Sequence, residues 1–186
     1  LRNYSGMALL SIGFPYILAE STINLFSPAL NIHPTLLPSY RGPTSGAFIL
    51  INNEKKTGST VHFLEPEMDA GDIVLQSKVG LNAFDTVRSM QKKVYKTEPQ
   101  LLIEALRKLE RGEPATNQKS QEASIFPKRT PDDSQIDPNR SLLDLFNEIR
   151  ACDAEMYPAF FYLEGQKVCV KLWRPERPIE EEEESL

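Results

Sequence analysis

Cysteine is scarce in this sequence, and basic residues are outnumbered by acidic ones. The 186 residues include two cysteines, Cys152 and Cys169, which are too few for a disulfide framework and lack metal-ligand spacing. We therefore expect a reducing compartment, the cytoplasm, and no metal site. The net charge of -5 gives no overall attraction to phosphate backbones, so nucleic acid is a disfavoured partner.

Long apolar runs are also missing. Residues 6–12 form one of the longest, well short of the roughly 20 residues that cross a bilayer, so we expect no membrane partner. Residue 1 is Leu, without an initiator Met or a basic-then-apolar leader. This numbering is therefore expected to begin inside a longer natural chain.

The first part of the chain alternates between strands and helices. Residues 7–12 are a continuous small-apolar run, typical of a strand that is covered on both faces. Residues 18–26 have the spacing of a short helix, and residues 29–33 predict a second strand that ends at Pro34. Because a strand–helix–strand unit returns to the same sheet, the two strands should be adjacent and parallel.

Further along the chain, the pattern predicts a helix, a pair of strands and a long helix. The first helix covers residues 44–53, and residues 57–64 and 72–79 alternate as strands around an acidic turn. Residues 84–109 are helical by period. Pro99 is expected to divide that helix or to begin a second segment.

Prolines among polar residues mark a linker before a second, smaller unit. A helix capped by Ser141 and a hairpin around residues 164–166 are expected in that unit. The predicted organisation is a core in 1–112, a linker in 113–138, a small C-terminal unit in 139–174 and a disordered acidic tail in 175–186.

Few residues in the core are suited to chemistry. Asn31 and His33 are two apart on the second strand, so their side chains share a face and can converge on one substrate atom. Asp69 lies in the acidic turn, where a carboxylate could face a strand end. These residues alone leave a structural alternative open. Asn31 and His33 could be buried, hydrogen-bonded sheet residues, and Asp69 could be a solvated carboxylate in a surface turn. His62 is interpreted as structural, with orientation of Asp69 as its functional alternative.

Two ordered motifs connect this sequence to a known family. The first motif is NIHPTLLPSYRG, at residues 31–42. The second has two parts, TGSTVH at residues 57–62 and MDAGDI at residues 68–73. Both motifs resemble the signatures of the folate-dependent formyltransferases, which include glycinamide ribonucleotide formyltransferase, methionyl-tRNA formyltransferase and the amino-sugar N-formyltransferases. The resemblance implies an α/β fold with a Rossmann-like formyltransferase core and 10-formyltetrahydrofolate as co-substrate.

The resemblance also implies roles for individual residues. Asn31, His33 and Asp69 match the catalytic Asn, His and Asp of the family. Transfer of a formyl group to an amine builds negative charge on the formyl oxygen and positive charge on nitrogen. Asn31 and a protonated His33 would donate to that oxygen, and Asp69 would hold His33 charged and accept the amine proton.

Binding residues follow from the same resemblance. Tyr40 and Arg41 match the loop on the side of the acceptor amine, although Arg41 could equally be a surface charge. The residues matching the folate pocket are Phe14, Ile17, Glu65, Glu67 and Met68.

Two departures from the family pattern stand out. The strand, helix and strand that open the family's core are absent before residue 7, so either the natural chain is longer or this copy is truncated. A truncated copy would have an exposed sheet edge and an incomplete folate pocket. The C-terminal α+β unit resembles the start of the barrel of the transfer-RNA and sugar enzymes and is too short to close it.

These observations favour formyl transfer to the amine of an amino-sugar nucleotide. Residues 127–160 resemble the region after the core in the sugar and transfer-RNA branches. The net negative charge argues against binding of a large polyanion. Methionyl-tRNA is the alternative acceptor. A non-catalytic folate-binding or regulatory relic is the alternative of another class, and a homodimer is left open.

Overall fold

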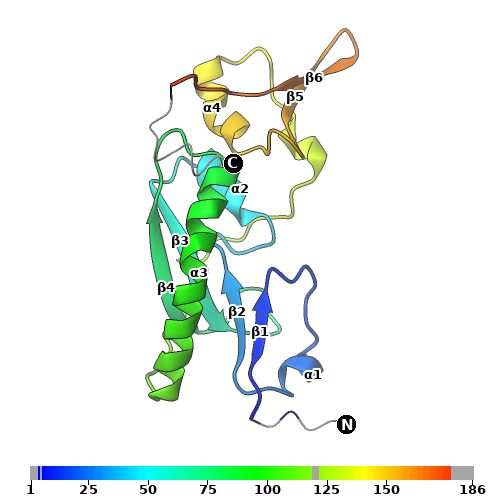
Figure 1. The fold of residues 1–186 in the computed structure, drawn as a ribbon. Helices are drawn as coiled ribbons and strands as arrows, with labels where there is room; N and C mark the ends of the chain where they lie inside the picture. Colours follow the sequence, from blue (N-terminus) through cyan, green and yellow to red (C-terminus); the bar gives the residue numbers. More distant parts are fainter. Residues whose placement is uncertain (1–3, 5, 119–121, 177–186) are drawn as a thin grey trace.

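Four strands form a mixed sheet at the centre of the fold (Figure 1). The computed structural model describes residue 4 and residues 6–118 and 122–176. Strands β1 and β2 are parallel and β3–β4 is antiparallel, as predicted, and β2 also pairs antiparallel with β3. The α/β fold is confirmed, and the strands follow the sheet order β1 Leu9–Ile12, β2 Ala29–His33, β3 Lys56–Phe63 and β4 Ile73–Gly80.

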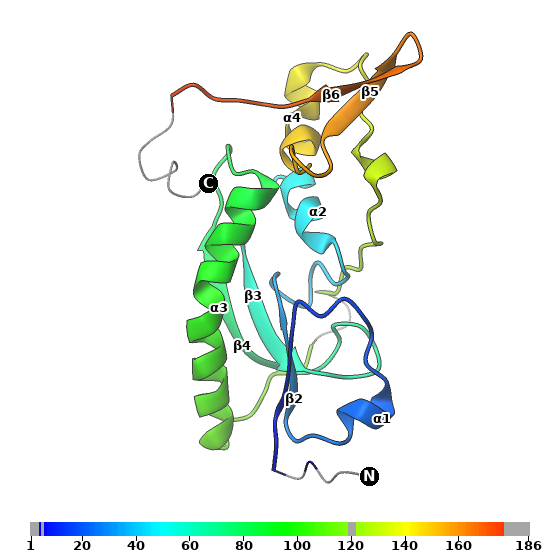
Figure 2. The same ribbon diagram turned by 45° about the vertical axis from the view of Figure 1, so that its right-hand side comes forward.

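Three helices accompany this sheet. Helices α1 (Glu20–Ile23) and α2 (Ser45–Ile51) are shorter than predicted, because their ends turn into the flanking loops. Helix α3 (Val87–Glu110) packs along β3 and β4 and covers one face of the sheet (Figures 1 and 2). Thr86 caps α3 by accepting a hydrogen bond from the N–H of Ser89.

Helix α3 continues through Pro99, so the expected division at this proline is wrong. A proline inside a helix removes one hydrogen bond and costs about 3 kcal/mol without other support. Here each half of the helix buries its apolar side chains. Met90 and Val94 pack into a core with Leu50, and Leu101 and Ala105 pack into another beneath the sheet. Tertiary packing on both sides of the proline therefore keeps the helix whole.

The C-terminal unit contains the predicted helix and hairpin. Helix α4 (Leu142–Arg150) is capped by Ser141, and β5 (Ala159–Leu163) pairs antiparallel with β6 (Gln166–Val170). The Arg150 side chain fixes this unit to the core: it is buried and donates to the carbonyl oxygens of two residues, Asp85 and Leu50. Most of the predicted acidic tail, residues 177–186, lies outside the described residues.

The predicted linker packs along the core. Thr116 pairs with Ile73 of β4, and the main chain of Arg41 is hydrogen-bonded to Ser124 and Phe126. The segment then forms the short 3-10 helix η2 (Pro131–Ser134) before it reaches α4. Residues from this segment therefore lie beside the loop that follows β2.

Strand β1 is an edge of the sheet. Within the described residues its one partner is β2, and Leu10 and Ile12 on it are exposed. An edge strand presents unpaired N–H and C=O groups to any added strand. Among all the residues that the structure describes, no helix combines the length and the apolar character needed to span a bilayer.

Candidate active site

Polar residues of β2 and β3 share the face of the sheet that α3 does not cover. Asn31 and His33 alternate with Leu30 and Ile32, which point into the core on the α3 side. The register of β2 and β3 places His62 beside Asn31. His33 and His62 are both buried. The two strands therefore bring an amide and two imidazoles into one small area.

Asp69 reaches this area because the β3–β4 loop folds back across the sheet. Its backbone is left-handed, with φ of 53°, a conformation that Asp tolerates better than most residues. Gly71 allows the close return, because a Cβ at this position would overlap the carbonyl oxygen of Phe63. The N–H of Gly42 then donates to Asp69 Oδ2 at 3.0 Å.

The structure brings together the three residues that the sequence singled out. Asp69 Oδ2 lies 3.6 Å from His33 Nδ1, and Asp69 Oδ1 lies 3.8 Å from His62 Nε2. Asn31 Nδ2 lies 3.1 Å from the same His62 nitrogen. Only 12% of the Asp69 side chain is exposed, so its carboxylate is shielded from bulk water and its interactions are weakly screened.

His62 has a defined proton arrangement. Its Nδ1 lies 2.8 Å from the carbonyl oxygen of Phe63, which can only accept, so Nδ1 carries the proton. Its Nε2 must then accept from the Asn31 amide. Burial lowers the pKa of His62 to about 4, so the ring is neutral at pH 7. His62 thus orients the Asn31 amide as well as facing Asp69.

Unfolding measurements can test this neutral, buried His62. The unfolded chain has an ordinary His pKa of about 6.5, so between about 6.5 and 4 it binds more protons at this residue than the folded chain does. The free energy of unfolding should therefore decrease as pH falls through this range. His62 accounts for a decrease in the free energy of unfolding on the order of 3 kcal/mol over this range.

The matched variant for this prediction is His62→Gln. Glutamine can donate to the Phe63 carbonyl and accept from Asn31, but it does not titrate. Urea unfolding between pH 7 and 4 should show the wild-type protein losing more stability than the variant. Parallel pH profiles for the two proteins would contradict a buried neutral His62.

The other imidazole is fixed by the loop after β2. His33 Nε2 lies 3.0 Å from the carbonyl oxygen of Tyr40, so it donates to that oxygen and Nδ1 is left facing Asp69. Thr35 Oγ1 donates to the same carbonyl. Tyr40 has a left-handed backbone with φ of 59°, which turns its carbonyl toward His33.

Comparison with known proteins identifies the fold around this site. The sequence profile of the formyl transferase family matches residues 4–106, more than half of the 186 residues. The chain belongs to the formyl transferase family. The family uses a folate as its formyl donor.

Solved structures resemble this formyl transferase over most of its length. A 4-N formyltransferase from Francisella tularensis has a TM-score of 0.80 and 25% identity, covering 91% of this chain and 72% of that one. A sugar N-formyltransferase from Shewanella sp FDAARGOS_354 has a TM-score of 0.76 and 24% identity, with coverages of 92% and 71%. HypX from Aquifex aeolicus, in complex with tetrahydrofolic acid, has a TM-score of 0.75 and 22% identity, with coverages of 87% and 28%. A methionyl-tRNA formyltransferase from Clostridium thermocellum is similar as well, at a TM-score of 0.71 and 23% identity, with coverages of 86% and 68%.

In this formyl transferase, Tyr40 and Arg41, which were assigned to acceptor binding, both make contacts within the protein, and the assignment remains a prediction. The Tyr40 ring stacks on Phe126, with ring centroids 5.0 Å apart, and its hydroxyl donates to Glu54. The Tyr40 main-chain carbonyl, rather than the phenol, contacts His33. Arg41 is 5% exposed, so it is not the surface charge that was considered as its alternative.

The residues assigned to the folate lie on two exposed loops. Phe14 and Ile17, in the loop between β1 and α1, are 51% and 73% exposed. The β3–β4 loop carries Glu65, Glu67 and Met68, all exposed. Glu67 lies 3.4 Å from Arg41 NH1. Their exposure leaves these side chains accessible to a ligand, and their assignment to the folate remains a prediction.

Sequence reasoning missed the main-chain groups of this site in the formyl transferase. Gly42 supplies the N–H that holds Asp69, and Tyr40 supplies the carbonyl that holds His33. Gly42 has φ of 113°, and a Cβ there would overlap the carbonyl oxygen of Phe126. A glycine directly after the Tyr-Arg pair was the available signal.

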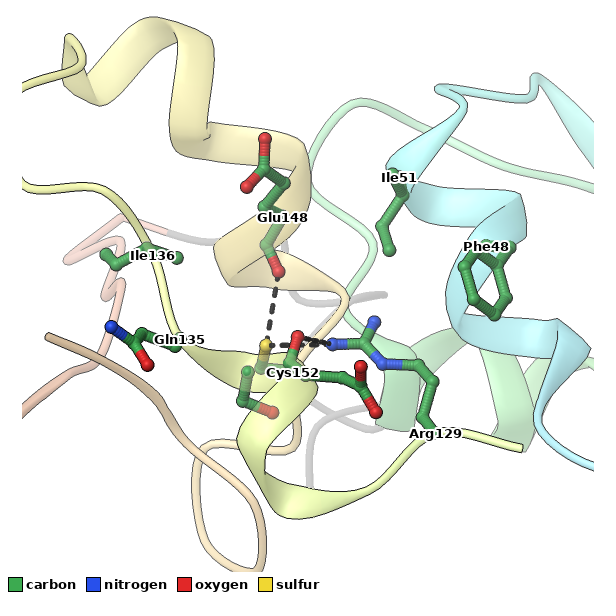
Figure 3. A pocket seen from close by; sticks show the side chains of 9 residues that line it. Phe48, Ile51, Arg129, Gln135, Ile136, Glu148 and Cys152 are labelled. Atoms are coloured by element: carbon green, nitrogen blue, oxygen red, sulfur yellow. Dashed lines mark hydrogen bonds between the residues drawn. The ribbon is translucent and has the colours of Figure 1, made fainter. Parts of the chain in front are cut away.

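A cavity of about 240 Å³ lies between α2, η2 and α4 (Figure 3). Arg129 NH2 donates to the carbonyl oxygen of Asp133 and lies 3.9 Å from Cys152 Sγ, whereas NH1 is buried without a partner among the described residues. Asn31, His33 and Asp69 do not line this cavity. Its walls are formed by Phe48, Ile51, Arg129, Asp133, Ser134, Gln135, Ile136, Glu148 and Cys152.

Proposed function

We propose that this chain transfers the formyl group of 10-formyltetrahydrofolate to the primary amine of an amino-sugar nucleotide. The observation that carries this proposal is the convergence of Asn31, His33 and Asp69 on the face of the sheet that α3 leaves open. Their arrangement offers hydrogen-bond donors and a carboxylate acceptor within a few ångströms of one another. Formyl transfer to an amine needs both.

Asn31 and Asp69 would have separate roles in this reaction. The amine nitrogen attacks the formyl carbon, a C–N bond forms, and negative charge develops on the formyl oxygen. Asn31 Nδ2 carries two N–H groups, and the one not donated to His62 can stabilise this oxygen. Asp69 takes the proton from the attacking nitrogen, directly or through water. The C=O bond then re-forms as the bond to the folate nitrogen breaks, and that nitrogen takes up the proton from Asp69, directly or through water.

His33 has one nitrogen left for this reaction. Its Nε2 is engaged by the Tyr40 carbonyl, so any donation toward the formyl oxygen comes from Nδ1 of a protonated ring. Asp69 Oδ2 lies 3.6 Å from that nitrogen, so the carboxylate and the imidazole are adjacent at the proposed reaction site.

A small acceptor is favoured over transfer RNA. The chain carries a net charge of -5, which opposes binding of a polyanion. The Shewanella relative is described as a sugar N-formyltransferase, and the sequence after the core resembles the sugar and transfer-RNA branches. Among the cationic side chains near the site, Arg41 is buried and already has two partners, so it adds little attraction for a phosphate backbone.

The test is formyl transfer by the natural full-length protein to a panel of amino-sugar nucleotides and to charged initiator transfer RNA. We expect turnover with a sugar nucleotide, and a rate that changes by less than about threefold between 50 and 200 mM salt, because few phosphates are bound. Activity on the RNA alone, falling steeply with salt, would move the chain to the methionyl-tRNA branch. Binding of a folate analogue without transfer to any acceptor would support the non-catalytic alternative.

A further inference from the structure

Gln118, in the segment after α3, is a buried residue whose side-chain amide is fully hydrogen-bonded near the Asp69 carboxylate. Only 7% of it is exposed. Its Nε2 donates to the carbonyl oxygens of Asp69, at 2.9 Å, and Gly71, at 2.7 Å. Its Oε1 accepts from Arg41 NH2 at 2.8 Å. One side chain thus joins three segments that are far apart in the sequence.

The β3–β4 loop needs such an anchor. Residues 65–68 are exposed, and Asp69 adopts a left-handed backbone that is costly for a residue other than glycine. Gly42 holds the Asp69 carboxylate, but it does not hold the loop backbone. Gln118 fixes the carbonyl oxygens on both sides of Ala70, and therefore the direction in which the Asp69 side chain leaves the chain.

Arg41 connects this anchor to the loop that contains Tyr40 and Gly42. Its guanidinium donates to Gln118, while its main chain is bonded on both sides to Ser124 and Phe126. The residue before it supplies the carbonyl that holds His33, and the residue after it supplies the N–H that holds Asp69. The contacts of His33 and of Asp69 are therefore tied together through Arg41 and Gln118.

We propose that Gln118 is a positioning residue for formyl transfer, which holds the Asp69 carboxylate in the orientation needed to accept the amine proton. This inference rests on the proposed function, because it assigns Asp69 that role. Gln118 itself contacts neither the amine nor the formyl group. A misplacement of about 1 Å at a reacting group can cost on the order of a hundredfold in rate, so the anchor is expected to affect turnover far more than substrate affinity.

The deciding variant is Gln118→Glu in the natural full-length protein. Glutamate has the same shape and keeps an oxygen for Arg41, but it replaces both N–H donors with a carboxylate oxygen facing two carbonyl oxygens. The control is Gln166→Glu, the same amide-to-acid change at an exposed position of β6. Gln118→Met, which removes the three hydrogen bonds without adding charge, replaces Gln118→Glu if that variant fails to fold.

Two measurements distinguish the outcomes. Hydrogen–deuterium exchange of residues 64–72 should become faster in the Gln118 variant and stay unchanged in the control. We expect kcat to fall by about ten- to a hundredfold with KM for folate and amine within about threefold of wild type. Unchanged kcat, or a loss confined to KM, would overturn the positioning role even if the loop exchanges faster.

Failure of the proposed function would look different. A wild-type protein that transfers formyl to none of the acceptors removes the catalytic role of Asp69, and with it this proposal, whatever the exchange data show. A wild-type protein that is active, with Gln118 and Gln166 variants equally active, overturns the inference about Gln118 alone.

Discussion

Replacement of Asp69 by Asn should reduce kcat by about 10²- to 10⁴-fold while leaving the affinity for a folate analogue within about threefold of wild type. Asparagine has the same shape, tolerates the left-handed backbone at this position, and keeps an oxygen for the N–H of Gly42. The change therefore removes the negative charge and the proton acceptor without removing the hydrogen bond that shapes the loop.

Single-turnover transfer and calorimetric binding of the folate analogue together check this prediction. The control is Asp72→Asn, which changes the same residue type in the same loop, where the Asp72 carboxylate accepts a hydrogen bond from Asn117 at the surface. That variant should retain near wild-type kcat. An active Asp69→Asn protein would show that another group accepts the amine proton, and equal losses in both variants would show that the loop's charge, rather than Asp69, matters.

Local periodicity and motif spacing were sufficient to predict the framework of this site. The apolar run at residues 7–12 and the strand at 29–33 are parallel neighbours because a short helix connects them. Two residues spaced by two on a strand had to share a face, so Asn31 and His33 could be placed together from the sequence. The resemblance to the family added Asp69, which local sequence alone would leave in a solvated turn.

Contacts between distant segments were beyond such reasoning. Pro99 was expected to break α3, but the helix is held by apolar packing on both sides, which no local pattern reveals. The stacking of the Tyr40 ring on Phe126, 86 positions later in the chain, was likewise not predicted. Gln118 sits in a proline-containing segment with no motif, and only the folded chain places its amide against the Asp69 loop.

The pairing of Asn31 with His62 was missed for a related reason. The register of β2 and β3 sets it, and register depends on the β3–β4 pair and on the loop that follows β2. His62 was weighed as structural or as a partner of Asp69. Its bond to Asn31 adds a function that follows from the tautomer, since the neutral ring with a proton on Nδ1 presents a lone pair to the Asn31 amide.

Replacement of Asn31 by Asp should reduce kcat by about 10²- to 10³-fold, because the carboxylate cannot donate to the developing oxyanion. The new carboxylate would lie beside His62 Nε2, where Asn31 Nδ2 now lies at 3.1 Å. An adjacent negative charge favours the protonated imidazole, so the pKa of His62 should rise from about 4. The variant is therefore expected to be folded, with a charged His62 and little turnover.

Nuclear magnetic resonance of the imidazole groups measures this rise directly, because the chain has two histidines and a His62→Gln protein assigns their signals. Asn24→Asp, the same substitution at an exposed position, is the control and should leave both the His62 titration and kcat unchanged. If the Asn31→Asp protein keeps kcat within about tenfold of wild type, Asn31 is not the oxyanion donor. If kcat falls but the His62 pKa does not move, the hydrogen bond between Asn31 and His62 is absent in solution. Asn31 would then keep its catalytic role, and His62 would not be the residue that orients it.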